Sequence, residues 1–229
     1  MIIFAYDFPH RKTEDFIIYC YVKNIKIDAV IGTSWKKLNV STPKFKTKVS
    51  VRPIYSPKML CEKLKISYYN CEHNSDNTYN IIKKINPDIG MIAGARILSS
   101  RIIKLFNKGI INFHPGDIPK IRGLNSSLRA IKLKHPQVVT AHLIDEDIDS
   151  GIILLKKKID MNPNDTLYDI NEKLYRLQID MIVDAIKKTN TGSGEKIKIS
   201  NPYHYKTPFE YYDDFKREFK KYMKWNSLH

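Results

Sequence analysis

The chain has 229 residues, 42% of them hydrophobic, which is enough for one full-sized α/β domain and a modest tail but not for two large domains. No stretch approaches the roughly 20 consecutive apolar residues that a membrane-spanning helix needs, and the first residues lack the order of a secretion signal. A soluble, cytoplasmic protein is therefore expected. Three cysteines without a Cys-x-x-Cys pair favour neither a disulfide framework nor a zinc site.

The formal net charge of +15 has two interpretations. The lysines are spread over the whole chain beside abundant isoleucine and asparagine, as an A/T-rich coding bias would produce, and no compact basic block with interleaved aromatics occurs before the tail. We therefore favour a solvated basic surface, with a non-catalytic nucleic-acid-binding domain as the alternative. A positive field would also attract an anionic small substrate, such as a nucleotide-linked compound.

Short β-branched runs alternate with helical patterns through the first two thirds of the chain. This alternation predicts an α/β fold with a Rossmann-like, mostly parallel twisted sheet flanked by helices. The expected strands are Ile2–Tyr6, Asp28–Thr33, Asp88–Ala93, Gly109–Phe113, Val138–Ile144 and Ile152–Ile159. The expected helices are Thr13–Val22, Pro57–Leu64, Asn77–Ile85, Ser99–Phe106 and Asn125–Lys132. No helix separates the last two strands, which predicts an antiparallel edge.

The clearest helical pattern runs from Asp165 to Lys188, with apolar residues spaced by three and four. It ends the main domain, expected at residues 1–190, and residues 191–229 form a C-terminal extension. The short aromatic and basic tail Pro202–His229 is expected to pack either on the domain or on a second subunit, so a homodimer stays open.

Several common site motifs are absent from the sequence. The first strand is followed by DFPHRKTEDF, which has no glycine to bring the backbone close to a pyrophosphate, so dinucleotide cofactors are disfavoured. The chain also lacks G-x-x-x-x-G-K-S/T, G-x-S-x-G and H-E-x-x-H. Nucleotide hydrolysis, serine esterase chemistry and zinc protease chemistry therefore lack their motifs.

Two polar residues lie at the end of an expected strand near the middle of the chain. Asn112 and His114 are two apart, so in a strand their side chains point to the same side, at the carboxyl end where open α/β sheets build their sites. Pro115 and Gly116 end the strand and turn the chain away, which predicts an accessible His114.

A second polar group is the loop Asp145–Gly151, which holds four acidic residues. It could be a metal site, an electrostatic partner for a histidine, or a solvated turn, and its spacing makes a metal the weakest of the three. A carboxylate beside His114 would raise the pKa of the imidazole. Taken singly, each of these residues also has an ordinary structural explanation.

Taken together, Asn112-Phe113-His114-Pro115-Gly116, Pro119, Arg122-Gly123 and Asp147-Ile148-Asp149-Ser150-Gly151 resemble the signature of formyltransferases that use N10-formyltetrahydrofolate. That family includes glycinamide ribonucleotide transformylase, methionyl-tRNA formyltransferase and sugar N-formyltransferases. The resemblance implies the formyltransferase fold, no metal, and Asn112, His114 and Asp149 as the catalytic trio. It places the folate against Ala95, Arg96, Ile97, Leu98, Ile144, Asp145 and Asp147. The acceptor would lie against Gly116, Arg122 and Gly123.

Formyl transfer turns the formyl oxygen into an anion when an uncharged amine attacks the formyl carbon. Asn112 and a protonated His114 would meet that charge, and Asp149 would accept the proton of the amine directly or through a water. Thr140 and His142, on the strand before the acidic loop, either support the site or are ordinary strand residues.

The acceptor is expected to be the amino group of a nucleotide-linked amino-deoxy-sugar, as in surface polysaccharide biosynthesis. The chain lacks the phosphate-binding first loop of the glycinamide ribonucleotide enzyme, and only residues 191–229 follow the last long helix, which leaves no room there for the extra domain of the tRNA enzyme. Glycinamide ribonucleotide, an amino acid or a peptide-bound amine are the alternative acceptors.

Overall fold

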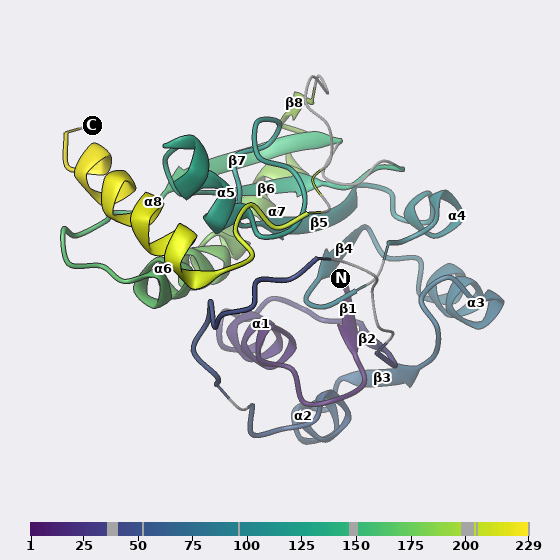
Figure 1. Ribbon diagram of the computed structural model, residues 1–229. Helices are drawn as coiled ribbons and strands as arrows, with labels where there is room; N and C mark the ends of the chain where they lie inside the picture. Colours follow the sequence, from purple (N-terminus) through teal and green to yellow (C-terminus); the bar gives the residue numbers. More distant parts are fainter. Residues whose placement is uncertain are drawn as a thin grey trace.

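The computed structural model describes residues 1–35, 41–51, 53–95, 97–146, 151–197, 204 and 206–228. Within these ranges one sheet runs in the order β3-β2-β1-β4-β5-β6-β7-β8 (Figure 1). The strands are β1 Ile2–Tyr6, β2 Ala29–Thr33, β3 Ser67–Asn70, β4 Ile89–Ile92, β5 Gly109–His114, β6 Val138–Leu143, β7 Ile152–Lys158 and β8 Glu195–Lys196.

The first five strands of the sheet are parallel, as the alternation of strands and helices predicted. The chain moves outward from β1 to β2 and β3, and then returns to place β4 on the other side of β1. Adjacent loops at the carboxyl ends of β1 and β4 therefore leave in opposite directions, which is where sheets of this kind open a crevice.

The remaining strands form the expected antiparallel edge. In the register of β5 and β6, Asn112 lies opposite His142, and His114 lies opposite Thr140. These four side chains therefore belong to one patch of the sheet at the end of β5.

Helices cover both faces of the sheet (Figure 1). They are α1 Arg11–Val22, α2 Pro57–Leu64, α3 Asp76–Ile85, α4 Ser100–Ile103, α5 Ser126–Leu133, α6 Leu167–Asp180, α7 Ile182–Asn190 and α8 Tyr212–Asn226. The larger core joins α1, α2, α6 and α7 to one face, and a smaller core joins α3 and α4 to the other. No helix in the described part of the chain is long and apolar enough to cross a membrane.

Several element boundaries differ from the sequence prediction. The edge strands β3 and β8 were not predicted, and the helix expected at Ser99–Phe106 is only the short α4. The helix expected from Asp165 to Lys188 divides at Met181, which ends α6 and begins α7. Met181 is fully buried, so the break turns both helices onto the sheet.

The C-terminal extension packs against the rest of the chain through α8. Phe215 and Tyr222 of α8 are buried with Leu128 and Ile131 of α5, and the Tyr222 hydroxyl donates to the carbonyl oxygen of His135 at 3.1 Å. In this structure α8 therefore packs against α5. The division of the chain at residue 190 stays a prediction.

Candidate active site

Asn112 is held by a histidine across the strand pair. Its Nδ2 lies 3.1 Å from Nε2 of His142, whose side chain is completely buried. An amide nitrogen can only donate, so His142 accepts at Nε2 and carries its proton at Nδ1. His142 therefore fixes the direction of the Asn112 amide, as expected if it supports the site.

His114 is bound through Nε2, which lies 2.9 Å from the carbonyl oxygen of Ile121 and 3.2 Å from Oγ of Ser126. The Ser126 hydroxyl donates its own hydrogen to the carbonyl of Gly123 at 2.9 Å. Both groups near Nε2 therefore accept, and Nε2 must carry a hydrogen.

The expectation that His114 is accessible is wrong, because only 6% of the residue is exposed. The chain does turn at Pro115 and Gly116, but the loop then folds back over the imidazole. Gly116 permits this approach, since a Cβ there would lie 2.5 Å from Nε2 of His114 and 2.7 Å from the Ile121 oxygen. A side chain at this position would displace the hydrogen bond that orients the ring.

The loop after β5 is tied to the antiparallel edge. Thr140 of β6 donates to the Gly116 carbonyl at 2.7 Å and accepts from the backbone nitrogen of Ile118. Asp117 accepts from Lys156 of β7 at 2.6 Å and pairs with His135 at 2.8 Å. Burial would raise the pKa of Asp117, but these two hydrogen bonds outweigh it and hold the pKa below its ordinary value.

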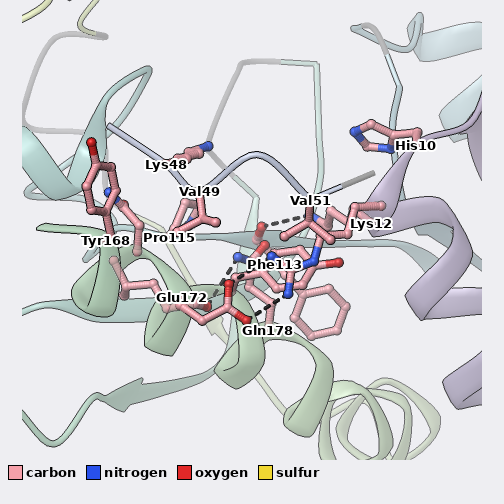
Figure 2. A pocket seen from close by; sticks show the side chains of 14 residues that line it. His10, Lys12, Lys48, Val49, Val51, Phe113, Pro115, Tyr168, Glu172 and Gln178 are labelled. Carbon is pink, nitrogen blue, oxygen red and sulfur yellow. Dashed lines mark hydrogen bonds and ion pairs between the residues drawn. The ribbon is translucent and has the colours of Figure 1, made fainter. Parts of the chain in front are cut away.

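A cavity of about 390 Å³ opens beside the end of β5. Figure 2 shows Val49 and Val51 on one side of it, and Glu172 and Gln178 of α6 on the other. His114, Ser126 and Gly123 line a second cavity of about 220 Å³. Pro115, Lys48 and Asn171 line both cavities. The two spaces therefore adjoin at the turn that follows His114.

The larger cavity is basic, because Arg11, Lys12 and Lys48 line it. Lys12 donates to the carbonyl of Phe113, between Asn112 and His114 in the chain, at 3.4 Å, and Lys48 lines the wall shared by both cavities. Burial and then the charge of Lys48 lower the pKa of Lys12 to about 7. Burial, together with both lysines, lowers the pKa of His10 to about 4, so that His10 is neutral at pH 7.

The only carboxylate on the cavity wall, within the described residues, is already paired. Both oxygens of Glu172 accept from Arg11, at 2.7 and 2.8 Å, and the Arg11 guanidinium lies 4.0 Å from the centre of the Tyr175 ring. Across those residues no carboxylate lies within ion-pair distance of Lys12 or Lys48. The cavity therefore favours an anionic ligand.

Of the expected folate residues that the structure describes, Ala95, Ile97 and Leu98 follow β4, and Ile144 and Asp145 follow β6. Ala95 is half-buried, Ile97 is exposed, and Leu98 is buried in the smaller core. Asn74 holds this loop by donating to the Ile97 carbonyl and accepting from the Ser99 nitrogen, at 2.9 and 2.8 Å. A cavity of about 430 Å³ lies just beyond, between the start of α4 and Ile144, Asp145 and Glu146.

Three of the expected site residues, Arg96, Asp147 and Asp149, lie outside the described residues. Among the expected acceptor-binding residues, Gly123 lines the smaller cavity, Gly116 is buried beside His114, and Arg122 is only 5% exposed. The structure therefore gathers Asn112, His114, Gly116 and Gly123 at the end of β5. In the described ranges no group of three or more acidic, histidine or cysteine side chains could hold a metal ion.

Sequence reasoning missed the basic cavity. A signal was present, because His10, Arg11 and Lys12 follow the first strand directly and so belong at the carboxyl edge of the sheet. Lys48 had no such signal, because it lies in an irregular segment far from α6 in the sequence. Its neighbour Thr47 accepts a hydrogen bond from Asn171 of α6 at a sequence separation of 124.

The fold and the site together define an open α/β protein whose polar site lies where its parallel strands end. Within that class the chain belongs to the formyl transferase family, which it matches over residues 27–186. The chain is 26% identical over 151 residues to a methionyl-tRNA formyltransferase of Thermotoga maritima, covering 65% of this chain and 47% of that protein. The chain thus spans about half the length of the curated relatives it matches.

Two solved structures have similar folds. A sugar N-formyltransferase from a Shewanella species has a TM-score of 0.59 at 19% identity, covering 94% of this chain and 78% of that one. Glycinamide ribonucleotide transformylase 1 from Symbiobacterium toebii has a TM-score of 0.61 at 15% identity, covering 86% and 93%. At these identities the likeness shows the fold, and it does not separate the two kinds of acceptor.

Proposed function

We propose that this chain transfers the formyl group of N10-formyltetrahydrofolate to the amino group of a nucleotide-linked amino-deoxy-sugar. The observation that carries the transfer reaction is the pair of oriented donors at the end of β5. Asn112 and His114 are two residues apart on one face of the strand, about 7 Å between Cα atoms. A hydrogen bond with His142 orients the Asn112 amide, and contacts with the Ile121 carbonyl and the Ser126 hydroxyl orient the His114 ring.

We propose that the folate binds at the ends of β4 and β6. The loop at Ala95–Leu98 is pinned by Asn74, and the neighbouring cavity combines the apolar Ile144 with the polar Asp145, which suits a planar ring that also forms hydrogen bonds. Ala95, Arg96, Ile97, Leu98, Ile144, Asp145 and Asp147 are the residues that we propose to hold it. When bound, the folate supplies the formyl group.

The chain's own groups then meet the charge that develops during transfer. The Asn112 amide and a His114 ring protonated at Nδ1 provide donors for the formyl oxygen, and donors fixed in advance need no reorganisation when the charge appears. Asp149 is the proposed acceptor for the proton that leaves the attacking amine. Gly116, Gly123 and Arg122 shape the adjoining acceptor space, in which Gly116 admits no side chain beside the His114 ring.

The choice of acceptor rests on the basic cavity. No carboxylate among the described residues pairs with Lys12 or Lys48, and a diphosphate would supply the negative charge that balances them. The sugar amine would then extend past Pro115 toward the end of β5. The two phosphate groups of a diphosphate suit two separated ammonium groups. Glycinamide ribonucleotide also carries a phosphate, so it remains the second candidate acceptor.

The test is to incubate the purified chain with N10-formyltetrahydrofolate and a panel of amines. The panel contains nucleotide-linked amino sugars with different bases and amino positions, glycinamide ribonucleotide, and simple amino acids. We expect a formyl increment by mass spectrometry on a nucleotide-linked amino sugar, and none with His114→Ala. Formylation confined to amines without phosphate would reject the proposed acceptor, and no product from any amine would reject the transferase.

A further inference from the structure

Residues 41–51 form the outer wall of the basic cavity without any helix or strand of their own. We call this segment the strap. Lys48, Val49 and Val51 face the cavity (Figure 2), and all three side chains are exposed rather than packed in a core. An irregular segment with so little burial of its own holds one conformation only if other elements anchor it.

The anchors come largely from the C-terminal extension. The Phe45 ring stacks on Phe215 of α8, with ring centroids 5.1 Å apart and an interplanar angle of 27°. The Lys44 backbone nitrogen donates to the Glu210 carbonyl at 2.8 Å, and its ammonium pairs with the Glu210 carboxylate at 2.5 Å and with the Tyr211 hydroxyl at 2.9 Å. Two residues further on, the Thr47 carbonyl accepts from Asn171 of α6 at 2.8 Å.

This order of contacts links the last helix of the chain to the cavity. Phe215 is only 3% exposed and packs with Leu128 and Ile131 of α5, so the strap is stacked on a side chain that the body of the protein holds firmly. Lys48 follows directly after the anchored Thr47 and lines both cavities. Lys48 therefore follows two anchors in the chain, Phe45 on α8 and Thr47 on α6, although no residue of α8 lines either cavity.

We propose that Glu210, Tyr211 and α8 are a positioning element of the acceptor site, which holds the strap so that Lys48 and Lys12 bind the phosphate groups of the acceptor together. The inference rests on the proposed function for its statement of what the cavity holds. Without the anchor, the strap spends part of its time away from α6. The apparent affinity for an anion is then the intrinsic affinity multiplied by the fraction of molecules in which the strap lies against α6.

The test uses the whole chain with inorganic pyrophosphate as the probe for the cavity and tetrahydrofolate as the probe for the other site. Phe45→Ala removes the stack from the strap side, and Phe215→Leu removes it from the helix side while keeping an apolar group in the core. Tyr222→Phe is the matched control, because it changes α8 at a contact with His135 that does not involve the strap. Binding constants are measured by calorimetry, and amide hydrogen exchange is followed at residues 41–51.

We expect both strap variants to bind pyrophosphate about tenfold more weakly and to exchange faster in the strap, with unchanged tetrahydrofolate binding. The double variant Phe45→Ala with Phe215→Leu is expected to be no weaker than the worse single variant, because both changes break one contact. Tyr222→Phe should match the wild type in both binding constants.

The proposal is overturned if the wild type does not bind pyrophosphate, if the strap variants bind it with wild-type affinity, or if they lose both ligands alike. These outcomes differ from a failure of the proposed function. A chain that loses pyrophosphate in the strap variants, yet formylates no amine, would support the positioning role and reject the transfer reaction.

Discussion

Lys12 combines a positive charge with surroundings that oppose it. Burial and the neighbouring Lys48 bring its pKa from an ordinary 10.5 to about 7, whereas the unfolded chain keeps the ordinary value. Between these two pH values the unfolded state binds the extra proton, so the folded state gains stability from this group as the pH rises. An anion bound in the cavity favours the protonated form of Lys12, whereas burial favours the neutral form. Anion binding should therefore be coupled to proton uptake at Lys12.

This coupling predicts a pH dependence for sulfate, which stays a dianion across the range. The affinity for sulfate should fall as the pH rises from about 6 to about 9, because Lys12 loses its proton near pH 7. His10, with its pKa near 4, does not change charge in that range. In Lys12→Met the affinity should be weaker and its pH dependence flatter, as followed by NMR titration. An equally steep slope in Lys12→Met would assign the dependence to another group.

At the scale of elements, the site depends on loops that are fixed to the antiparallel edge. The loop after β5 supplies the Ile121 carbonyl that orients His114, and Asp117 ties that loop to Lys156 of β7 and to His135. Asp117 is only 9% exposed, so its ion pair with Lys156 and its hydrogen bond with His135 are better shielded from water than contacts at the surface. A change at Asp117 should therefore affect both stability and turnover.

Asp117→Asn is expected to lower the free energy of unfolding by about 2 kcal/mol at neutral pH, because Lys156 keeps its charge but loses the carboxylate that balances it. The pKa of Asp117 is lowered from 3.8 in the folded state, so this contribution is present above that pH and is lost as the pH falls through the lower, folded value. Urea unfolding at several pH values measures it. The exposed pair of Lys157 and Asp184 provides the control, and Asp184→Asn should cost less than about 1 kcal/mol. Equal effects of the two substitutions would contradict the shielding argument.

The elements that the sequence predicted are those with a strong periodic pattern. The buried strands β1, β2 and β5 were found within a residue or so of their ends, because continuous apolar runs mark strands that are covered on both faces. The edge strand β3 carries the sequence SYYN with no buried residue, so it had no pattern to detect. The break at Met181 was missed because neither glycine nor proline marks it.

At the scale of the whole molecule, the sequence predicted that Asn112 and His114 share one face of a strand, but it did not predict the cavity. Residues two apart in a strand point to the same side, and this relation is visible in the sequence. Asn112 and His114 could therefore be placed together from the sequence alone. The cavity is assembled from α1, the strap and α6, and the strap is fixed in turn by α8 at the far end of the chain. No spacing rule connects these segments, and only the folded chain brings Lys12 and Lys48 to one space.

The central claim is that Asn112 and His114 act as a unit on one formyl oxygen. Its most direct test is the kcat/KM for formyl transfer in Asn112→Ala, His114→Ala and the double variant, with far-ultraviolet circular dichroism as the check on folding. Each single variant should lose about 10²- to 10³-fold, and the double variant little more, because groups that act together are not additive. Losses that multiply in the double variant, or single variants that keep nearly full activity, would contradict the account.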